Sequence, residues 1–358
     1  MQNYLCLSID GLQSGMIGAY GNTWIQTPAL DAFASQSVLF DRFYASSLDM
    51  SNTLAEWWRL PADLHRDYHK VLITDDADVF LHEHASHFDE KHRLESKQYN
   101  RPAKKIEGTQ LYHNFATLAD ILHHHLDNRL DKPVLFWAHF KGLRGRWDFP
   151  LSYRRRYQIE QDPYPYAEVV PPDIDLTDIV DPDVRQAVAE AYSGGVTVLD
   201  DVFFGLFEFF MEEGLDEDTV LLFTSVRGFS LGEHRYIGAN DELYGENVHL
   251  PLIIRFPHGT TQDTVFAGFR SQTLLQPADI WELLQAKVFP EEPDARHRSI
   301  SIRSDGLGNK VDITPDWFVY RKPSGCEMYV KPDDRWEVND VADRCSHILE
   351  EFELQGWR

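Results

Sequence analysis

Three aspartates stand directly after short apolar runs of the chain. Asp10 follows residues 4–9, and both Asp75 and Asp76 follow residues 71–74. Nearly continuous apolar runs of this length are typical of strands buried on both faces, and open α/β sheets bind their ligands at the carboxyl ends of such strands. Carboxylates gathered at one sheet edge could therefore hold a divalent cation such as calcium or magnesium.

Basic residues follow a third apolar run, residues 134–140. Lys141, Arg144 and Arg146 come directly after it, and three further arginines occupy 154–156. Guanidinium groups grip anions bidentately, so this stretch could bind a sulfate or phosphate group. The competing interpretation is an ordinary surface cluster that pairs with the many acids of the chain.

Histidines are concentrated in two stretches, 82–92 and 123–125. His-x-His with nearby carboxylates can bind a transition metal, but the first stretch has neither the HExxH order nor a four-ligand spacing. We therefore expect it to form a solvated polar face. The second stretch surrounds a helical stripe of apolar residues between 115 and 126, which predicts a helix that covers the sheet.

The composition describes an acidic globular chain of 358 residues with a formal net charge of -24. Hydrophobic residues make up 43%, enough for a sizeable core, and the charge disfavours nucleic acid and anionic membranes as partners. Three scattered cysteines do not form a disulfide framework or a zinc knuckle. Without an export signal or a stretch of about 18 apolar residues, the chain is expected to be cytoplasmic.

Strand-like and helical patterns alternate along most of the chain. Helices are predicted at 28–34, 184–211 and 277–284, and strands at 220–224 and 251–256. Residues 27 and 28 are Thr and Pro, a typical helix start, and Gly214 can end the long helix. The pattern predicts an α/β fold with a mostly parallel sheet between layers of helices. A small antiparallel sheet with one helix follows, giving domains at 1–292 and 293–358.

Longer segments carry a resemblance to a known family. The run SID…GAYGN…TPALDAFASQSVLFDRFYA resembles the amino-terminal signature of the sulfatase family, in the alkaline-phosphatase-like superfamily. KPVLFWAHF, GENVHLPLIIRFP and EMYVKPDDRWEVNDVADR resemble later family segments, so the likeness covers nearly the whole chain. It implies a three-layer sandwich and a metal-dependent hydrolase of sulfate or phosphate esters, in which Asp10 binds the cation.

The nucleophile position of that family is changed. Where the family oxidises a Cys or Ser to formylglycine, this chain has Met50, whose thioether cannot attack an ester. A register slip of one residue offers Ser51, with Thr53 two residues further on, so a hydroxyl nucleophile of the phosphatase kind stays open. The competing interpretation of Ser51 is the N-cap of a helix, because no activating base is evident beside it.

The metal-binding motif is changed as well. The family's T-S-D-H-G or T-S-D-N-G is TSVRG at residues 224–228, which places Val226 and Arg227 where two ligands are expected. Of the family's metal ligands, Asp10 is the position that we match. We predict that the guanidinium of Arg227 takes the place of the ion and hydrogen-bonds Asp10, since a buried carboxylate needs a counter-charge. Alternatively, Arg227 points to solvent and Asp10 caps its own loop.

Two functions follow from these residues. The first is a pseudoenzyme that has lost sulfuric ester hydrolysis, needs no cofactor, and binds a protein partner or a sulfated or phosphorylated small molecule or glycan. Its ligand-binding residues would be Asp10, Arg144, Arg146 and Arg227. The alternative is an active metal-dependent sulfatase or phosphatase with a rebuilt site. It would hold calcium or magnesium on Asp10, Asp75 and Asp76, with Ser51 or Thr53 as nucleophile.

Overall fold

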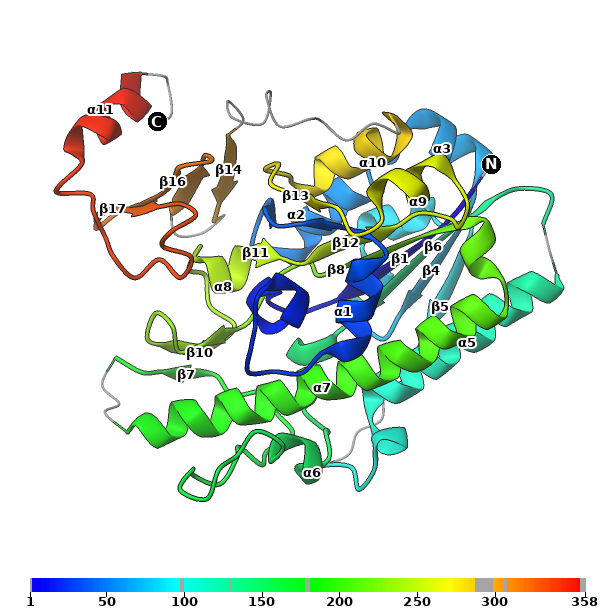
Figure 1. The fold of residues 1–358 in the computed structure, drawn as a ribbon, viewed down its shortest axis with the longest axis horizontal. Helices are drawn as coiled ribbons and strands as arrows, with labels where there is room; N and C mark the ends of the chain where they lie inside the picture. The colour runs from blue at the N-terminus through cyan, green and yellow to red at the C-terminus, as the bar shows by residue number, and fades with distance from the viewer. Residues whose placement is uncertain are drawn as a thin grey trace.

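The computed structural model describes residues 2–96, 100–128, 130–177, 181–286, 299–304 and 308–354. In this part of the chain, eight strands form one central sheet (Figure 1). Their order is β13 (Arg270–Ser271), β2 (Val38–Phe40), β12 (Leu252–Arg255), β8 (Thr219–Thr224), β1 (Asn3–Ile9), β6 (Val134–Phe140), β4 (His69–Thr74) and β5 (Glu90–Arg93). Strands β8, β1, β6, β4 and β5 run parallel, and β12 is antiparallel to both of its neighbours. The predicted mostly parallel sheet is confirmed.

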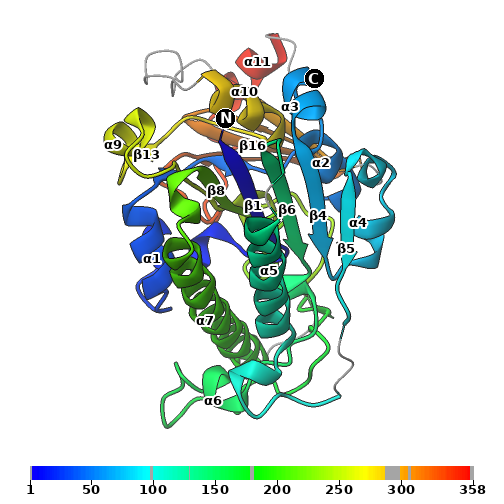
Figure 2. The same cartoon turned by 90° about the vertical axis from the view of Figure 1, so that its right-hand side faces the viewer.

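The two faces of the sheet bury different side chains, because successive residues of a strand point to opposite faces. In β1, Leu5 and Leu7 belong to one hydrophobic cluster, whereas Tyr4 and Cys6 belong to another. The first cluster is covered by α1 (Pro28–Ser35), α5 (Gln110–Asp127) and α7 (Pro182–Glu212). The second is covered by α2 (Met50–Trp57), α3 (Ala62–Asp67) and α10 (Pro277–Ala286). Figure 2 shows the resulting three layers.

Helix α1 starts where the sequence predicted, with Thr27 as the N-cap residue and Pro28 as the first helical residue. The side chain of Thr27 does not cap α1. The carboxylate of Asp200, on α7, accepts hydrogen bonds from the backbone N–H groups of Ala29 (3.1 Å) and Leu30 (2.8 Å) instead. Thr27 accepts from the N–H of Gly18, so its hydroxyl holds the preceding loop. Gly214 ends α7 as predicted, with a φ of 68° that favours glycine.

A second sheet near the carboxyl terminus is antiparallel. It contains β14 (Ile300–Arg303), β15 (Lys310–Ile313), β16 (Trp317–Lys322) and β17 (Gly325–Val330), in that order. Its inner face, including Ile302, Phe318 and Tyr320, belongs to the same hydrophobic cluster as α2 and α10. Its outer face packs with α11 (Ser346–Leu354) through Met328 and Phe352. The predicted small sheet with one helix is confirmed, and the predicted boundary at 292/293 lies outside the described residues.

Short elements complete the described chain. The remaining helices are α4 (Ala77–Leu81), α6 (Leu151–Arg154), α8 (Gly245–Val248) and α9 (Thr261–Phe266). The remaining strands form two small pairings, β3 (Phe43–Tyr44) with β11 (His249–Leu250), and β7 (Ile174–Asp175) with β10 (Tyr236–Gly238) and β9 (Ser230–Leu231). None of the described helices has the length and apolar character needed to cross a membrane.

Candidate functional site

Asp10 and Arg227 form a buried ion pair at the carboxyl ends of β1 and β8. The two strands are parallel neighbours in which Ser8 pairs with Thr224, so the residues after them must lie side by side. The Nε of Arg227 donates to both carboxylate oxygens of Asp10 at 3.1 Å, and Nη2 donates to Oδ2 at 2.9 Å. The side chain of Asp10 is 1% exposed. The predicted pairing is confirmed, and the alternative of a solvent-facing Arg227 is wrong.

The surroundings of this pair keep both groups charged. Burial alone would raise the pKa of Asp10, but the charges of Arg227 and Arg144 outweigh burial and lower it. Burial opposes the charge of Arg227, and Asp10 outweighs that effect, so the pKa of Arg227 is raised. Arg144 approaches over Gly11, where a Cβ would lie 2.8 Å from the Arg144 side chain. Two guanidinium groups thus act on one carboxylate.

Helix α2 begins beside Arg227. The Sδ of Met50 lies 3.9 Å from Nη2 of Arg227, so the thioether is next to the ion pair. The predicted cap at Ser51 is wrong, because Asp49 is the N-cap and accepts from the backbone N–H of Ser51 at 2.7 Å. Thr53 is fully buried and donates its hydroxyl to the carbonyl of Ser47 at 2.9 Å. The hydroxyl proton of Thr53 is therefore used in that hydrogen bond. The side chain of Ser51, in contrast, is exposed.

Asp75 and Asp76 are held by protein donors at the end of β4. Asp75 accepts hydrogen bonds from the backbone N–H of Lys141 (2.9 Å) and from Nδ2 of Asn114 (2.8 Å). Burial is the largest influence on Asp75 and raises its pKa. Asp76 caps α4 by accepting from the N–H of Asp78 at 2.9 Å, and it lies 3.6 Å from Nζ of Lys141. These contacts make both aspartates parts of the loop structure.

Sequence reasoning did not select His139, a fully buried residue of β6. Its Nδ1 lies 3.3 Å from Oγ of Ser8, and Nε2 has no hydrogen-bond partner among the described residues. Burial lowers the pKa of His139, opposed by the negative charges of Asp10, Asp76 and Asp75. The available sequence signal was a polar residue near the end of a buried apolar run. In the structure, His139 pairs with Ser8 across β6 and β1.

The three aspartates do not fit the divalent cation that the rebuilt hydrolase requires. Both oxygens of Asp10 accept from Arg227, and Asp75 and Asp76 are bonded as described above. Calcium and magnesium need about six oxygen ligands around one point. Among the described residues, the groups of three or more His, Cys, Asp or Glu with ligand atoms within 4.8 Å of one another do not include these aspartates.

The arginines predicted to bind an anion are divided between two hollows. Arg144 and Arg146 line a cavity of about 300 Å³ together with Lys141, Asp75 and Asn114. Arg227 lines a different cavity, of about 480 Å³, whose wall carries the carboxylates of Asp49, Asp78 and Asp241. Positive charge is therefore concentrated in the first hollow, which we call the basic hollow.

The neighbouring Arg154 has a structural role. It is fully buried and donates to the backbone carbonyls of Trp147, Phe149, Tyr166 and Glu168. These bonds hold the irregular segment that follows β6, so Arg154 is not available to a ligand.

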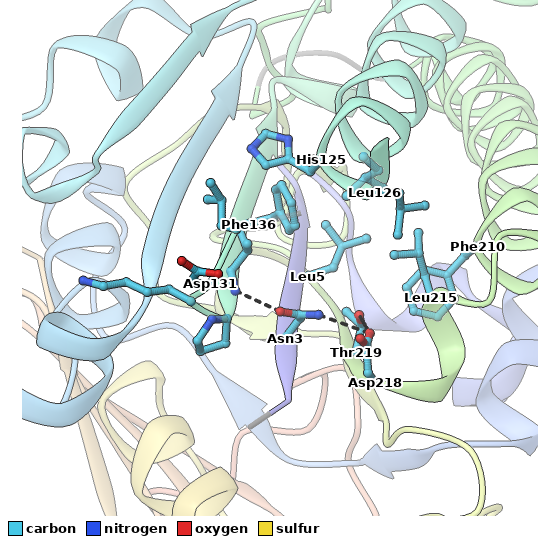
Figure 3. A pocket seen from close by; sticks show the side chains of 15 residues that line it. Asn3, Leu5, His125, Leu126, Asp131, Phe136, Phe210, Leu215, Asp218 and Thr219 are labelled. Carbon is cyan, nitrogen blue, oxygen red and sulfur yellow. Dashed lines mark hydrogen bonds between the residues drawn. The ribbon is translucent and has the colours of Figure 1, made fainter. Parts of the chain in front are cut away.

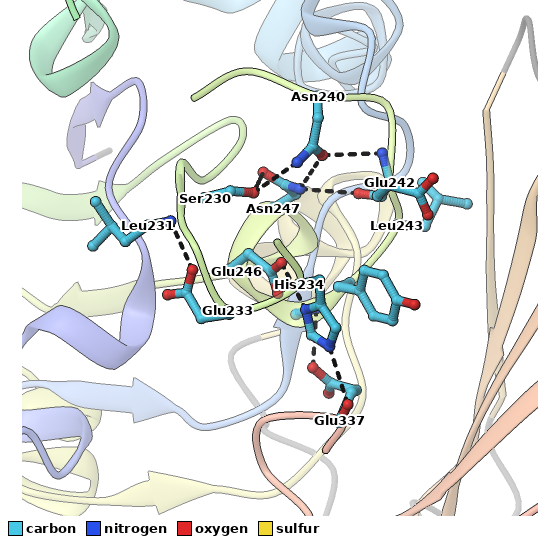
Figure 4. A network of polar contacts seen from close by, with 12 residues as sticks. Ser230, Leu231, Glu233, His234, Asn240, Glu242, Leu243, Glu246, Asn247 and Glu337 are labelled. Atoms are coloured by element: carbon cyan, nitrogen blue, oxygen red, sulfur yellow. Dashed lines mark hydrogen bonds and ion pairs between the residues drawn. The ribbon is translucent and has the colours of Figure 1, made fainter. Parts of the chain in front are cut away.

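Two further features lie away from this edge. Figure 3 shows a hollow at the opposite end of the strands, of about 330 Å³ and lined by apolar side chains such as Leu5 and Phe136. Figure 4 shows His234 between Glu246, on α8, and Glu337, in the segment that follows the second sheet. The Gly-Glu-His stretch at 232–234 therefore joins two parts of the fold.

Comparisons with solved structures agree with this arrangement. A phosphonate monoester hydrolase of Agrobacterium radiobacter superposes with a TM-score of 0.72 at 16% identity, covering 99% of this chain and 94% of the other. A protein solved with its substrate D-glucosamine-2-N,6-O-disulfate gives 0.70 at 16% identity, with coverage of 99% and 96%. A 2-O GAG sulfatase gives 0.67 at 16% identity, with coverage of 99% and 90%. No curated protein sequence matches the chain.

The sheet order and these superpositions define an α/β protein with the alkaline-phosphatase-like fold. The sequence model of the sulfatase family matches residues 68–280, more than half of the chain. The chain belongs to the sulfatase family.

Proposed function

We propose that this sulfatase-family chain has lost ester hydrolysis and binds a sulfated or phosphorylated ligand instead. The observation that carries the proposal is the bidentate contact of Arg227 with Asp10, at the sheet edge where the resemblance places the metal ion. A guanidinium is a permanent cation that cannot polarise an ester as a metal ion does or lower the pKa of a bound water.

The nucleophile position supports the loss of hydrolysis. Met50 lies against Arg227, and its thioether has no proton to lose and no anionic form that could attack sulfur or phosphorus. The buried Thr53 hydroxyl is committed to a backbone carbonyl. Ser51 is exposed, and the nearby ring nitrogen Nε2 of His82 faces its carbonyl oxygen at 3.1 Å. A neutral serine hydroxyl without a base is a poor nucleophile.

The basic hollow supports an anionic ligand. Lys141, Arg144 and Arg146 line it, and these three cations outnumber the one carboxylate in its wall, Asp75. A solved structural relative has a disulfated glucosamine as its substrate, which makes sulfated sugars the first ligands to test. The net charge of -24 opposes anions at long range, so binding should be weak and sensitive to salt.

Turnover of an aryl sulfate and an aryl phosphate, with calcium or magnesium added, tests the loss of hydrolysis. We expect no turnover above background, because removing a nucleophile alone can cost on the order of 10⁶ in rate. Ser51→Ala is the matched variant. Turnover that disappears in Ser51→Ala, together with a stoichiometric cation, would establish the rebuilt hydrolase instead.

Titration with sulfated oligosaccharides tests the basic hollow. We expect Arg144→Ala and Arg146→Ala each to weaken binding about tenfold, the effect of losing roughly 1.4 kcal/mol of charge-assisted hydrogen bonding. Arg66→Ala is the control, because Arg66 is an exposed arginine that pairs with its neighbour Asp67. Affinity should also fall as salt rises in the unmodified chain. Equal affinity in all three variants would remove the basic hollow from consideration.

A further inference from the structure

Two histidines and a glutamate converge at the edge of the sheet that is farthest from β13. Glu90 lies on the edge strand β5, His69 begins β4, and His125 lies near the end of α5. Their ligand atoms all lie within 4.8 Å of one another. His69 is the first residue of β4, and Asp75 follows the last residue of the same strand. Six residues of extended chain place the two about 20 Å apart. The group is therefore separate from the Asp10 edge.

The strand register explains why these side chains meet. Val71 pairs with Glu90, and side chains two residues apart on a strand share a face. His69, on the same face as Val71, thus projects toward the side of the sheet that carries Glu90. Helix α5 covers this face, where the ring of His125 packs edge-on against Phe136 at 5.0 Å. Figure 2 shows β4, β5 and α5 in this region.

The hydrogen bonds leave a place for a cation. Nδ1 of His125 lies 2.9 Å from the carbonyl oxygen of Ile121, so Nδ1 must donate its proton there. In the neutral ring, Nε2 then carries a lone pair, and it faces Oε2 of Glu90 at 3.4 Å. Two acceptors held face to face repel each other unless a proton or a metal ion lies between them. Nε2 of His69 approaches the same Oε2, also at 3.4 Å.

The two distances of 3.4 Å between a histidine nitrogen and the Glu90 oxygen suit a tetrahedral metal. Zinc bonds of about 2.0–2.1 Å to nitrogen and oxygen set neighbouring donor atoms about 3.3 Å apart. Metal-binding imidazoles typically donate their other N–H to a backbone carbonyl, as His125 does, and metal-binding carboxylates are themselves hydrogen-bonded. The second oxygen of Glu90, Oε1, is bonded by Nε2 of His92. The Glu90 side chain is 36% exposed, which gives an ion a path from solvent.

We propose that His69, Glu90 and His125 bind a zinc ion, with His92 orienting the glutamate and water completing the coordination. Two imidazoles and one carboxylate form a donor set that suits zinc. Calcium and magnesium favour sites made of oxygen ligands alone. The ion would tie the four-residue edge strand β5 to β4 and to α5. This site neither requires nor uses the ligand proposed for the basic hollow.

The site is tested by titrating zinc into the chelator-treated chain and measuring the heat of binding by calorimetry. We expect one zinc ion per chain, and the absorption of tetrahedral cobalt when Co²⁺ replaces zinc. His125→Ala and the nearly isosteric Glu90→Gln should abolish this binding, and His92→Ala should weaken it about 10- to 100-fold. Calcium should not compete.

His124→Ala is the matched control, because His124 is the adjacent residue on α5 and is exposed. It should leave zinc affinity unchanged. If the unmodified chain binds no stoichiometric zinc, or if Glu90→Gln binds zinc as tightly as the unmodified chain, the group holds a proton between its acceptors and the proposal is overturned.

Discussion

The buried carboxylate of Asp10 depends mainly on Arg227 for its counter-charge. Asp10 is 1% exposed, and its carboxylate is stabilised chiefly by Arg227, with Arg144 as a second cation. Removing one partner of a buried pair leaves the other charge without compensation, at a cost of about 3–5 kcal/mol. Because Arg227 itself is 23% exposed, we expect Arg227→Ala to lower the free energy of unfolding by about 3 kcal/mol, measured by denaturant titration.

The double variant Asp10→Asn with Arg227→Ala is the control for this prediction. It removes both charges, so it should be more stable than Arg227→Ala alone. Equal stability of the single and double variants would mean that the pair is not coupled, and water would then have to solvate Asp10.

At the scale of residues, the sequence predicted contacts that follow from strand order and missed those that depend on side-chain packing. The Asp10–Arg227 pair follows from two parallel strands with aligned ends. His139 was missed because the three carboxylates whose charges act on its pKa are distant in sequence. The convergence of His69, Glu90 and His125 was likewise invisible, because no ligand spacing along the chain indicates it.

Among the elements, α8 and the segment after the second sheet meet around His234. Nδ1 of His234 lies 2.9 Å from Oε1 of Glu246, and Nε2 lies 3.0 Å from the carbonyl oxygen of Glu337. Both partners accept, so both ring nitrogens donate and the imidazole is charged. Burial opposes this charge, but the hydrogen bond and charge of Glu246, with help from Glu337, raise the pKa of His234 to about 9.

This pKa predicts a loss of stability in alkali. The folded pKa lies above the ordinary value of 6.5, so the contribution of His234 is complete below pH 6.5 and disappears as pH rises through about 9. The difference corresponds to roughly 3 kcal/mol. Burial raises the pKa of Glu337 to about 7. The titration of Glu337 therefore changes the stability at a lower pH than the titration of His234 does. We expect unfolding measured between pH 7 and 9.5 to show this loss in the unmodified chain and little of it in His234→Gln.

His258→Gln is the control for the pH series, since the side chain of His258 is 72% exposed. A stability profile of His234→Gln that falls as steeply as that of the unmodified chain would exclude His234 as the cause. An NMR titration of the His234 ring near its ordinary pKa would contradict the prediction directly.

Long elements were predicted well, and short polar ones were not. Burial decides the conformation of the long elements, and burial leaves a pattern in the sequence. Apolar runs identified β1, β6 and β8, and an amphipathic pattern identified α7. Strand β5 has the sequence EKHR and no apolar residue, so its pairing with β4 had no sequence signal. The start of α1 at Thr27 and Pro28 was predicted, but the carboxylate that accepts from its first N–H groups belongs to Asp200, which is distant in sequence.

At the scale of the whole molecule, the second sheet shares the hydrophobic core of the first. Tyr320, on β16, is fully buried and belongs to the cluster that includes Cys6 and Trp57. Its hydroxyl accepts from the backbone N–H of Leu243 and from Nδ2 of Asn309, both at 3.1 Å. A shared core of this kind couples the folding of the two sheets, because neither can separate without exposing apolar surface.

We therefore expect one unfolding transition in calorimetry, with both sheets melting together. Tyr320→Phe deprives the Leu243 N–H and Asn309 of an acceptor, and a buried donor without a partner costs about 1–3 kcal/mol. The variant should shift the single transition to lower temperature without dividing it, whereas Tyr112→Phe, at a tyrosine of α5 that is 37% exposed, should leave it in place. Two transitions, of which Tyr320→Phe moves one, would show instead that the second sheet folds as a unit of its own.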